Sequence, residues 1–203
     1  MRQLVFPLPT VVDYSSAAFL PTAGSAAART ALGALQPSEV SNSLNGLVIV
    51  GGPASGKTHL LSMWRANYGE ACAVMDGLES LDAAGQTELF HTFNRLKEAG
   101  GALLVASRVP VQELTLLPDL KSRLLTLQHV YVLPPDDAEL AQLVLKWAVD
   151  RQLTLPPAVV TYLLARAERS PAALRALVGA LDELSLEEKR GVTVGLVRRV
   201  LEG

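Results

Sequence analysis

The sequence has little cysteine, no excess of charge and no long hydrophobic run. Its single cysteine, Cys72, excludes an intrachain disulfide framework and a multi-cysteine metal site. Eighteen Lys and Arg nearly balance 20 Asp and Glu, so the net charge of −2 argues against polybasic binding to nucleic acid. Apolar runs such as 47–50 are far shorter than the roughly 20 residues of a membrane helix, and the N-terminus lacks a secretory signal pattern. We expect a cytoplasmic protein with no membrane partner.

Apolar residues are plentiful, at 49% of 203 residues, which is enough for one or two domains. Short continuous apolar runs alternate with segments of helical periodicity. The runs are at 47–50, 71–75, 102–106 and 130–133, and the helical segments at 25–35, 58–67 and 86–99. Such runs are typical of strands that are buried on both faces. The first part of the chain therefore predicts an α/β domain with a parallel sheet.

The pattern becomes purely helical after residue 135. Asp136, Ser170 and Thr193 are good N-caps for three helices, and Pro156-Pro157 opens another. No strand pattern occurs in this part. The sequence predicts a small all-α domain that begins near residue 136.

A complete Walker A pattern lies between the first apolar run and the first following helix. It consists of Gly51, Gly52, Pro53, Ala54, Ser55, Gly56, Lys57 and Thr58. Glycines let the backbone N–H groups face phosphates at a helix N-terminus, Lys57 would reach the β- and γ-phosphates, and Thr58 would bind Mg²⁺. The alternative is a glycine-rich turn that carries this pattern by chance. The pattern predicts binding of a nucleoside phosphate.

Asp76 follows the second apolar run, where an acid would hold Mg²⁺ through water. Hydrolytic relatives usually place a second acid next, to orient the attacking water, but this chain has Gly77. Glu79, two residues further on, is a candidate for the missing second acid, but the sequence does not give the direction of its side chain. The alternative role for Asp76 is capping at the surface. The sequence thus supports nucleotide binding better than turnover.

A wider pattern is carried by the segments 56–61, 88–94, 117–124, 130–137, 166–170, 181–182 and 189–194. Together these segments resemble the DnaA family of bacterial replication initiators, and within it the shorter Hda proteins, the regulatory inactivators of DnaA. The resemblance implies an AAA+ P-loop base over residues 16–135 and a helical lid over 136–203. It also implies ADP or ATP with Mg²⁺ as ligands.

Further roles come from the resemblance alone. It implies that Ser107 is the polar sensor near the γ-phosphate and that Arg123 is an arginine finger for a neighbouring subunit's nucleotide. It makes Arg175 the lid's sensor II residue and places His59 beside the nucleotide. A surface ion pair is the alternative for each arginine, and packing is the alternative for His59.

Residues 1–15 read as an extended arm. Gln3, Leu4, Phe6 and Leu8 resemble the short peptide by which Hda proteins bind the β subunit sliding clamp. In such a peptide the glutamine forms hydrogen bonds and the apolar residues fill a pocket. An arm with two prolines loses less entropy on docking than a flexible one. The alternative is an edge strand packed on its own domain.

The resemblance implies a negative regulator of replication initiation that binds adenine nucleotide and the clamp and stimulates hydrolysis of DnaA-bound ATP. It implies DnaA as partner and allows a homodimer. Direct sequence-specific DNA binding is not expected, because the chain ends after the lid. The alternatives are a self-contained DnaA-family ATPase or loader, and a degenerate nucleotide-binding module without turnover.

Some expectations concern single positions or the length of a segment. Lys57 and Asp76 lie close in sequence for an AAA+ module, so either the sheet lacks an edge strand or the chain lacks residues that belong there. We expect Cys72 to be buried and inert, Trp64 and Trp147 to pack, and the three histidines to form no metal site. His129 is expected at the surface.

Overall fold

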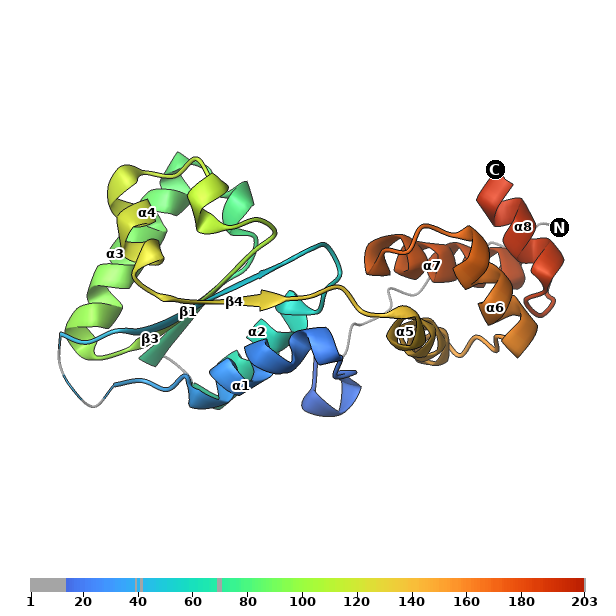
Figure 1. Ribbon diagram of the computed structural model, residues 1–203, viewed down its shortest axis with the longest axis horizontal. Coiled ribbons are helices and arrows are strands. Elements are labelled where there is room, and N and C mark those ends of the chain that lie inside the picture. The colour runs from blue at the N-terminus through green and yellow to red at the C-terminus, as the bar shows by residue number, and fades with distance from the viewer. Residues whose placement is uncertain (1–13, 39, 41, 69–70, 203) are drawn as a thin grey trace, which may run out of the picture. The chain divides into compact units, whose positions relative to one another are not determined.

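The computed structural model describes residues 14–38, 40, 42–68 and 71–202. Contacts divide them into a base unit, Tyr14–Pro134, and a lid unit that begins at Pro135 (Figure 1). None of the described helices is long and apolar enough to cross a membrane. The predicted clamp-binding residues Gln3, Leu4, Phe6 and Leu8 lie outside the described residues.

The base unit contains a parallel sheet of four strands, as the sequence predicts. They are β1 (Asn45–Gly51), β2 (Cys72–Met75), β3 (Ala102–Ser107) and β4 (Gln128–Val132), in the order β2-β3-β1-β4. Val50 pairs with Ser107 on β3 and with Tyr131 on β4, so the carboxyl ends of these strands meet at one edge. β2 is an outer strand of this sheet. Among the described residues, no strand lies between β2 and the helix that precedes it in the sequence.

Helices cover both faces of this sheet (Figure 1). Helices α1 (Ala26–Ala34) and α2 (Lys57–Tyr68) pack on one face, and α3 (Ala83–Ala99) and α4 (Pro118–Leu125) on the other. Alternate residues of β1 enter the two cores: Leu47 and Ile49 face α1 and α2, whereas Val48 and Val50 face α3 and α4. The described residues of this unit also form short 3-10 helices, η1 (Ser16–Ala18), η2 (Ala23–Ser25), η4 (Leu78–Ser80) and η5 (Val111–Glu113).

The edges of the sheet differ from the sequence prediction. All four residues of β2, including Cys72, are half-buried, and Leu133 lies beyond β4 and is 61% exposed. An edge strand is covered less completely than a central one, and the apolar run does not distinguish the two. His129 is half-buried instead of exposed, with Nε2 3.0 Å from the Leu124 carbonyl oxygen.

Two helices of the base unit also differ from expectation. Helix α3 begins three residues early because the Asp82 carboxylate caps it, accepting a hydrogen bond from the Gly85 N–H at 2.8 Å. Helix α4 was not predicted as an element, although Pro118 at its first turn is a start signal. Trp64 packs as predicted: it is 4% exposed and its indole N–H donates to the Leu35 carbonyl oxygen at 3.0 Å.

The lid unit consists of the four predicted helices. They are α5 (Asp137–Asp150), α6 (Pro157–Arg166), α7 (Pro171–Glu188) and α8 (Val194–Glu202). The Asp136 carboxylate accepts from the Glu139 N–H at 2.8 Å, and the Ser170 hydroxyl accepts from the Ala173 N–H at 3.1 Å, so the caps form as expected. Trp147 packs in this core.

Candidate nucleotide-binding site

The phosphate-binding loop connects the end of β1 to the start of α2. Ala54 and Gly56 have φ angles of 54° and 90°, in the left-handed region that curls the backbone. A Cβ on Gly51 would lie 2.9 Å from Ser55 Oγ and 3.1 Å from Val132 Cβ, so side chains leave no room there. The Walker A residues thus form a tight loop at the carboxyl edge of the sheet.

The Lys57 ammonium is enclosed by this loop and is 8% exposed. Its Nζ donates to the carbonyl oxygens of Gly51 at 2.7 Å and Gly52 at 2.8 Å, and lies 3.3 Å from Ser55 Oγ. Burial lowers the pKa of Lys57, although the nearby carboxylates act in the opposite direction. No carboxylate of the described residues forms an ion pair with it. A buried cation with only neutral partners fits a phosphate ligand.

Thr58 and Asp76 come together beside this lysine. The Thr58 hydroxyl, at the start of α2, donates to Asp76 Oδ2 at 2.5 Å, just beyond the end of β2. Both residues are exposed. Hydroxyl and carboxylate oxygens are ligands that Mg²⁺ prefers. This pair therefore fits the magnesium end of a nucleotide site.

Ser107 ends β3 at the same edge, but it is fully buried. Its hydroxyl lies 2.6 Å from the Val109 carbonyl oxygen and 3.3 Å from Glu79 Oε2, and its one hydrogen serves one of them at a time. Gly77, with φ of 69°, turns the chain into η4, which carries Glu79. The Gly77 turn thus brings Glu79 back to the end of β3.

Arg108 is a residue that the sequence reasoning missed. Glu79 Oε2 accepts from the Arg108 backbone N–H at 3.1 Å, and Glu79 Oε1 lies 3.1 Å from Arg108 Nε. The pair joins residues far apart in sequence, so periodicity gives no signal for it. The sequence points to Arg108 only through its position directly after the predicted sensor, Ser107.

His59 anchors an N-terminal segment beside the loop. Its Nε2 lies 2.7 Å from the Ser15 carbonyl oxygen, and the rings of Tyr14 and Phe19 meet its ring edge-on at 5.5 Å and 5.1 Å. Phe19 Cε2 would be 3.4 Å from a Cβ on Gly56. Phe19, which the sequence reasoning also missed, therefore packs against the phosphate-binding loop.

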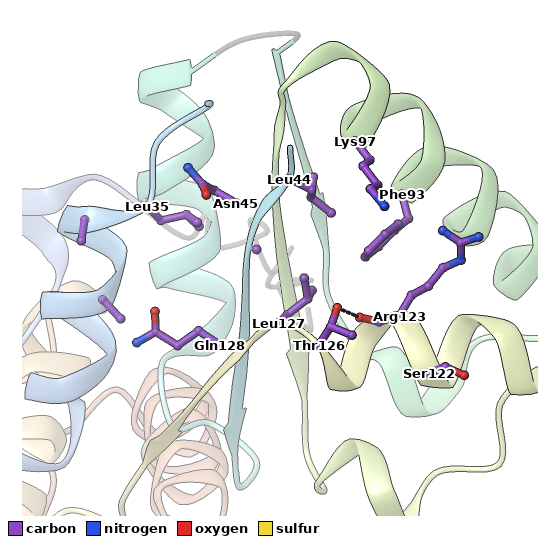
Figure 2. Close-up of a pocket in the computed structure, with 13 residues that line it drawn as sticks. Leu35, Leu44, Asn45, Phe93, Lys97, Ser122, Arg123, Thr126, Leu127 and Gln128 are labelled. Atoms are coloured by element: carbon purple, nitrogen blue, oxygen red, sulfur yellow. Dashed lines mark hydrogen bonds between the residues drawn. The ribbon is translucent and has the colours of Figure 1, made fainter. Parts of the chain in front are cut away.

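Arg123 lies at the other end of the sheet. Its guanidinium carbon is 4.6 Å from the centre of the Phe90 ring and 5.5 Å from that of Phe93. Figure 2 shows its side chain reaching from α4 toward α3, beside a pocket of about 580 Å³ that Asn45 also lines. Asn45 begins β1 and the phosphate-binding loop follows its end, so roughly 20 Å of strand separates the two sites. The base unit does not bring Arg123 to its own Lys57.

Arg175 belongs to the lid unit. It lies on α7 directly after the fully buried Leu174 and is itself half-buried. No ion pair of Arg175 occurs among the described residues. This distinguishes it from Arg190 and Arg199, which both pair with Glu188.

Comparisons with solved structures show the fold of most of the chain. Domain III of DnaA from Thermotoga maritima is 21% identical with a TM-score of 0.78, over 96% of this chain and 98% of that one. AMPPCP-bound DnaA from Aquifex aeolicus is 20% identical with a TM-score of 0.65, over 91% and 68%. RuvB, the Holliday junction branch migration motor of Thermotoga maritima, is 14% identical with a TM-score of 0.58, over 78% and 61%.

A family model gives a separate match in the lid. Residues 136–201 match the lid domain of Hda. This segment includes α5, α6, α7 and all of α8 except its last residue, Glu202. The lid of this chain is thus similar to that of Hda, and its fold is similar to that of DnaA domain III.

Proposed function

We propose that the chain is an Hda-like negative regulator of replication initiation, which binds adenine nucleotide at its own loop and stimulates hydrolysis of ATP on DnaA. One observation carries this proposal. A buried lysine whose hydrogen-bond partners among the described residues are all neutral lies at one end of β1, and an arginine held by aromatic rings lies at the other. The two cations are therefore suited to two different nucleotides.

The chain's own nucleotide would be held by the phosphate-binding loop. Lys57 would exchange its carbonyl partners for phosphate oxygens, and Thr58 and Asp76 would hold Mg²⁺, whose charge neutralises the phosphates. Two DnaA structures similar to this chain contain AMPPCP, which supports an adenine nucleotide here. Gly77 and the engagement of Glu79 with Arg108 favour binding over turnover by this chain alone.

Arg123 would act on the ATP of a DnaA partner. A guanidinium is permanently charged and binds phosphate oxygens through two parallel hydrogen bonds. Stacking on Phe90 and Phe93 fixes its direction without a carboxylate that would compete with phosphate. Arg175 would have a separate role, as the sensor II residue of the lid.

The arm would deliver the regulator to DNA. We infer that Gln3, Leu4, Phe6 and Leu8 bind the sliding clamp, because this short run joins a glutamine to apolar residues in the pattern of clamp-binding peptides. The near-zero net charge suits a protein that reaches DNA through the clamp. Clamp binding that survives the double change Gln3→Ala and Leu4→Ala would contradict this part.

The direct test of the proposed function is hydrolysis of DnaA-bound ATP in the presence of clamp-loaded DNA. We expect the wild-type chain to stimulate hydrolysis and Arg123→Ala to lose about 10³-fold of that stimulation, the scale for an arginine supplied in trans. Arg95→Ala, an exposed arginine on α3, is the matched control and should act like wild type. Equal stimulation by Arg123→Ala would contradict the proposal.

A further inference from the structure

The carboxyl edge of the sheet carries a second cation besides Lys57. Arg108 directly follows Ser107, which pairs in register with Val50, the residue before the first glycine of the loop. Its side chain is 62% exposed. Arg108 therefore follows β3 beside the point where the phosphate-binding loop follows β1, and its side chain is exposed there.

Glu79 holds Arg108 from one side only. The carboxylate uses one oxygen on the Arg108 backbone N–H and the other on Nε, both at 3.1 Å. No described residue forms a hydrogen bond with the terminal Nη1 and Nη2 groups of Arg108. These groups are the ones that bind a phosphate in the bidentate geometry.

Arg108 is among the charges that act on Lys57. Burial is the main cause of the lowered pKa of Lys57, Asp76 and Glu79 raise that pKa, and Arg108 has the weakest influence and lowers it. Two cations that follow neighbouring strands at the same end of the sheet favour a ligand with several negative charges. A γ-phosphate supplies more of that charge than a β-phosphate alone.

Ser107, the predicted sensor, is poorly placed for this role. It is fully buried, and the Val109 carbonyl oxygen lies 2.6 Å from its hydroxyl. Its hydroxyl would have to leave that partner before it could donate to a phosphate. The next residue, Arg108, has an exposed cationic side chain at this position.

From this geometry we infer that Arg108 binds the γ-phosphate of the nucleotide held at Lys57, and that Glu79 keeps Arg108 at the site until a triphosphate competes for it. The inference rests on the nucleotide site of the proposed function and adds a residue that distinguishes ATP from ADP. Glu79 acts as a positioning residue for Arg108. Binding of a triphosphate weakens the Glu79–Arg108 pair, so the nucleotide state changes the contact between η4 and the residue that follows β3.

The test is isothermal titration of the full chain with AMPPCP and with ADP, each with Mg²⁺. We expect Arg108→Ala to weaken AMPPCP binding about tenfold or more and to leave ADP binding unchanged. Arg108→Lys keeps the charge but not the fork, and should show a smaller loss. Glu79→Gln should strengthen AMPPCP binding a few-fold, since it removes the competing anion.

The two variants, Arg108→Ala and Glu79→Gln, should change the affinity for AMPPCP in opposite directions, which distinguishes this role from a structural one. If the pair only stabilised the corner between η4 and β3, Arg108→Ala and Glu79→Gln would weaken both nucleotides alike, and that result would overturn the inference. Unchanged AMPPCP binding by Arg108→Ala would overturn it too, while leaving the proposed function intact. Failure of the wild-type chain to bind either nucleotide would contradict both.

Discussion

The two ends of the base sheet hold their cations in opposite ways. At the carboxyl end, the Lys57 ammonium is buried and donates to backbone carbonyls and a hydroxyl of its own loop. At the amino end, the Arg123 guanidinium is half-buried and rests on the faces of two phenylalanine rings. Neither cation forms an ion pair with a carboxylate among the described residues. Both are therefore available to an anion from outside the chain.

The difference between these supports indicates two kinds of anion. A loop that surrounds its cation suits a ligand that enters and is enclosed, as phosphates are by backbone N–H groups. A cation on an open aromatic platform suits an anion presented by another molecule. The proposed function uses this difference: one end of the base unit would receive a nucleotide, and the other would act on a nucleotide held by a partner.

The largest effect on nucleotide affinity is expected for a substitution of Lys57. Lys57→Ala removes the ammonium that would bind the phosphates, so we expect nucleotide affinity to fall about 100-fold or more in isothermal titration. Arg123→Ala is the matched control and should bind nucleotide like wild type. Equal losses in the two variants would mean that the two ends do not serve separate ligands.

A smaller effect is expected when the aromatic platform is weakened. Phe90→Leu keeps an apolar side chain but removes the nearer of the two rings under Arg123, so stimulation of DnaA-bound ATP hydrolysis should fall by up to about tenfold. Nucleotide affinity should not change. Tyr162→Leu removes the comparable ring below Arg166 in the lid and should leave stimulation unaltered. A loss in nucleotide affinity with Phe90→Leu would contradict the separation of the ends.

The smallest effect concerns pH. Burial lowers the pKa of Lys57 below its ordinary 10.5, so as pH rises through the folded value the folded state loses this proton before the unfolded state does. The unfolded state then binds more protons and the free energy of unfolding rises with pH, up to the unfolded pKa. Urea unfolding from pH 7 to pH 10 should show a larger gain for wild type than for Lys57→Met.

Arg123→Met is the comparison at the amino end. Guanidinium groups keep their proton throughout this range, so its stability difference from wild type should not change with pH. Parallel stability curves for wild type and Lys57→Met would show that burial of Lys57 does not affect its proton.

Much of the fold could be predicted because it depends on local patterns. The strands at residues 47–50 and 102–106 are continuous apolar runs, and the lid helices start at caps such as Asp136 and Ser170. The half-burial of β2 could not be predicted, since an apolar run does not tell a central strand from an edge strand.

The candidate site was predictable only in part, for a related reason. The Walker A residues are contiguous, and the sequence therefore places Lys57 and Thr58 directly. The contacts of Glu79 depend on the left-handed turn at Gly77 and on a partner, Arg108, that directly follows β3. The aromatic support of Arg123 likewise joins α4 to α3, which no spacing within one segment reveals.

The central claim is that the two ends serve two different nucleotides, and an assay with labelled ATP tests it most directly. Labelled ATP is bound to DnaA and unlabelled nucleotide to this chain, or the reverse, and release of labelled phosphate is followed with clamp-loaded DNA. We predict rapid release only when the label is on DnaA, and its loss with Arg123→Ala. Rapid release from label on this chain, unaffected by Arg123→Ala, would contradict the account.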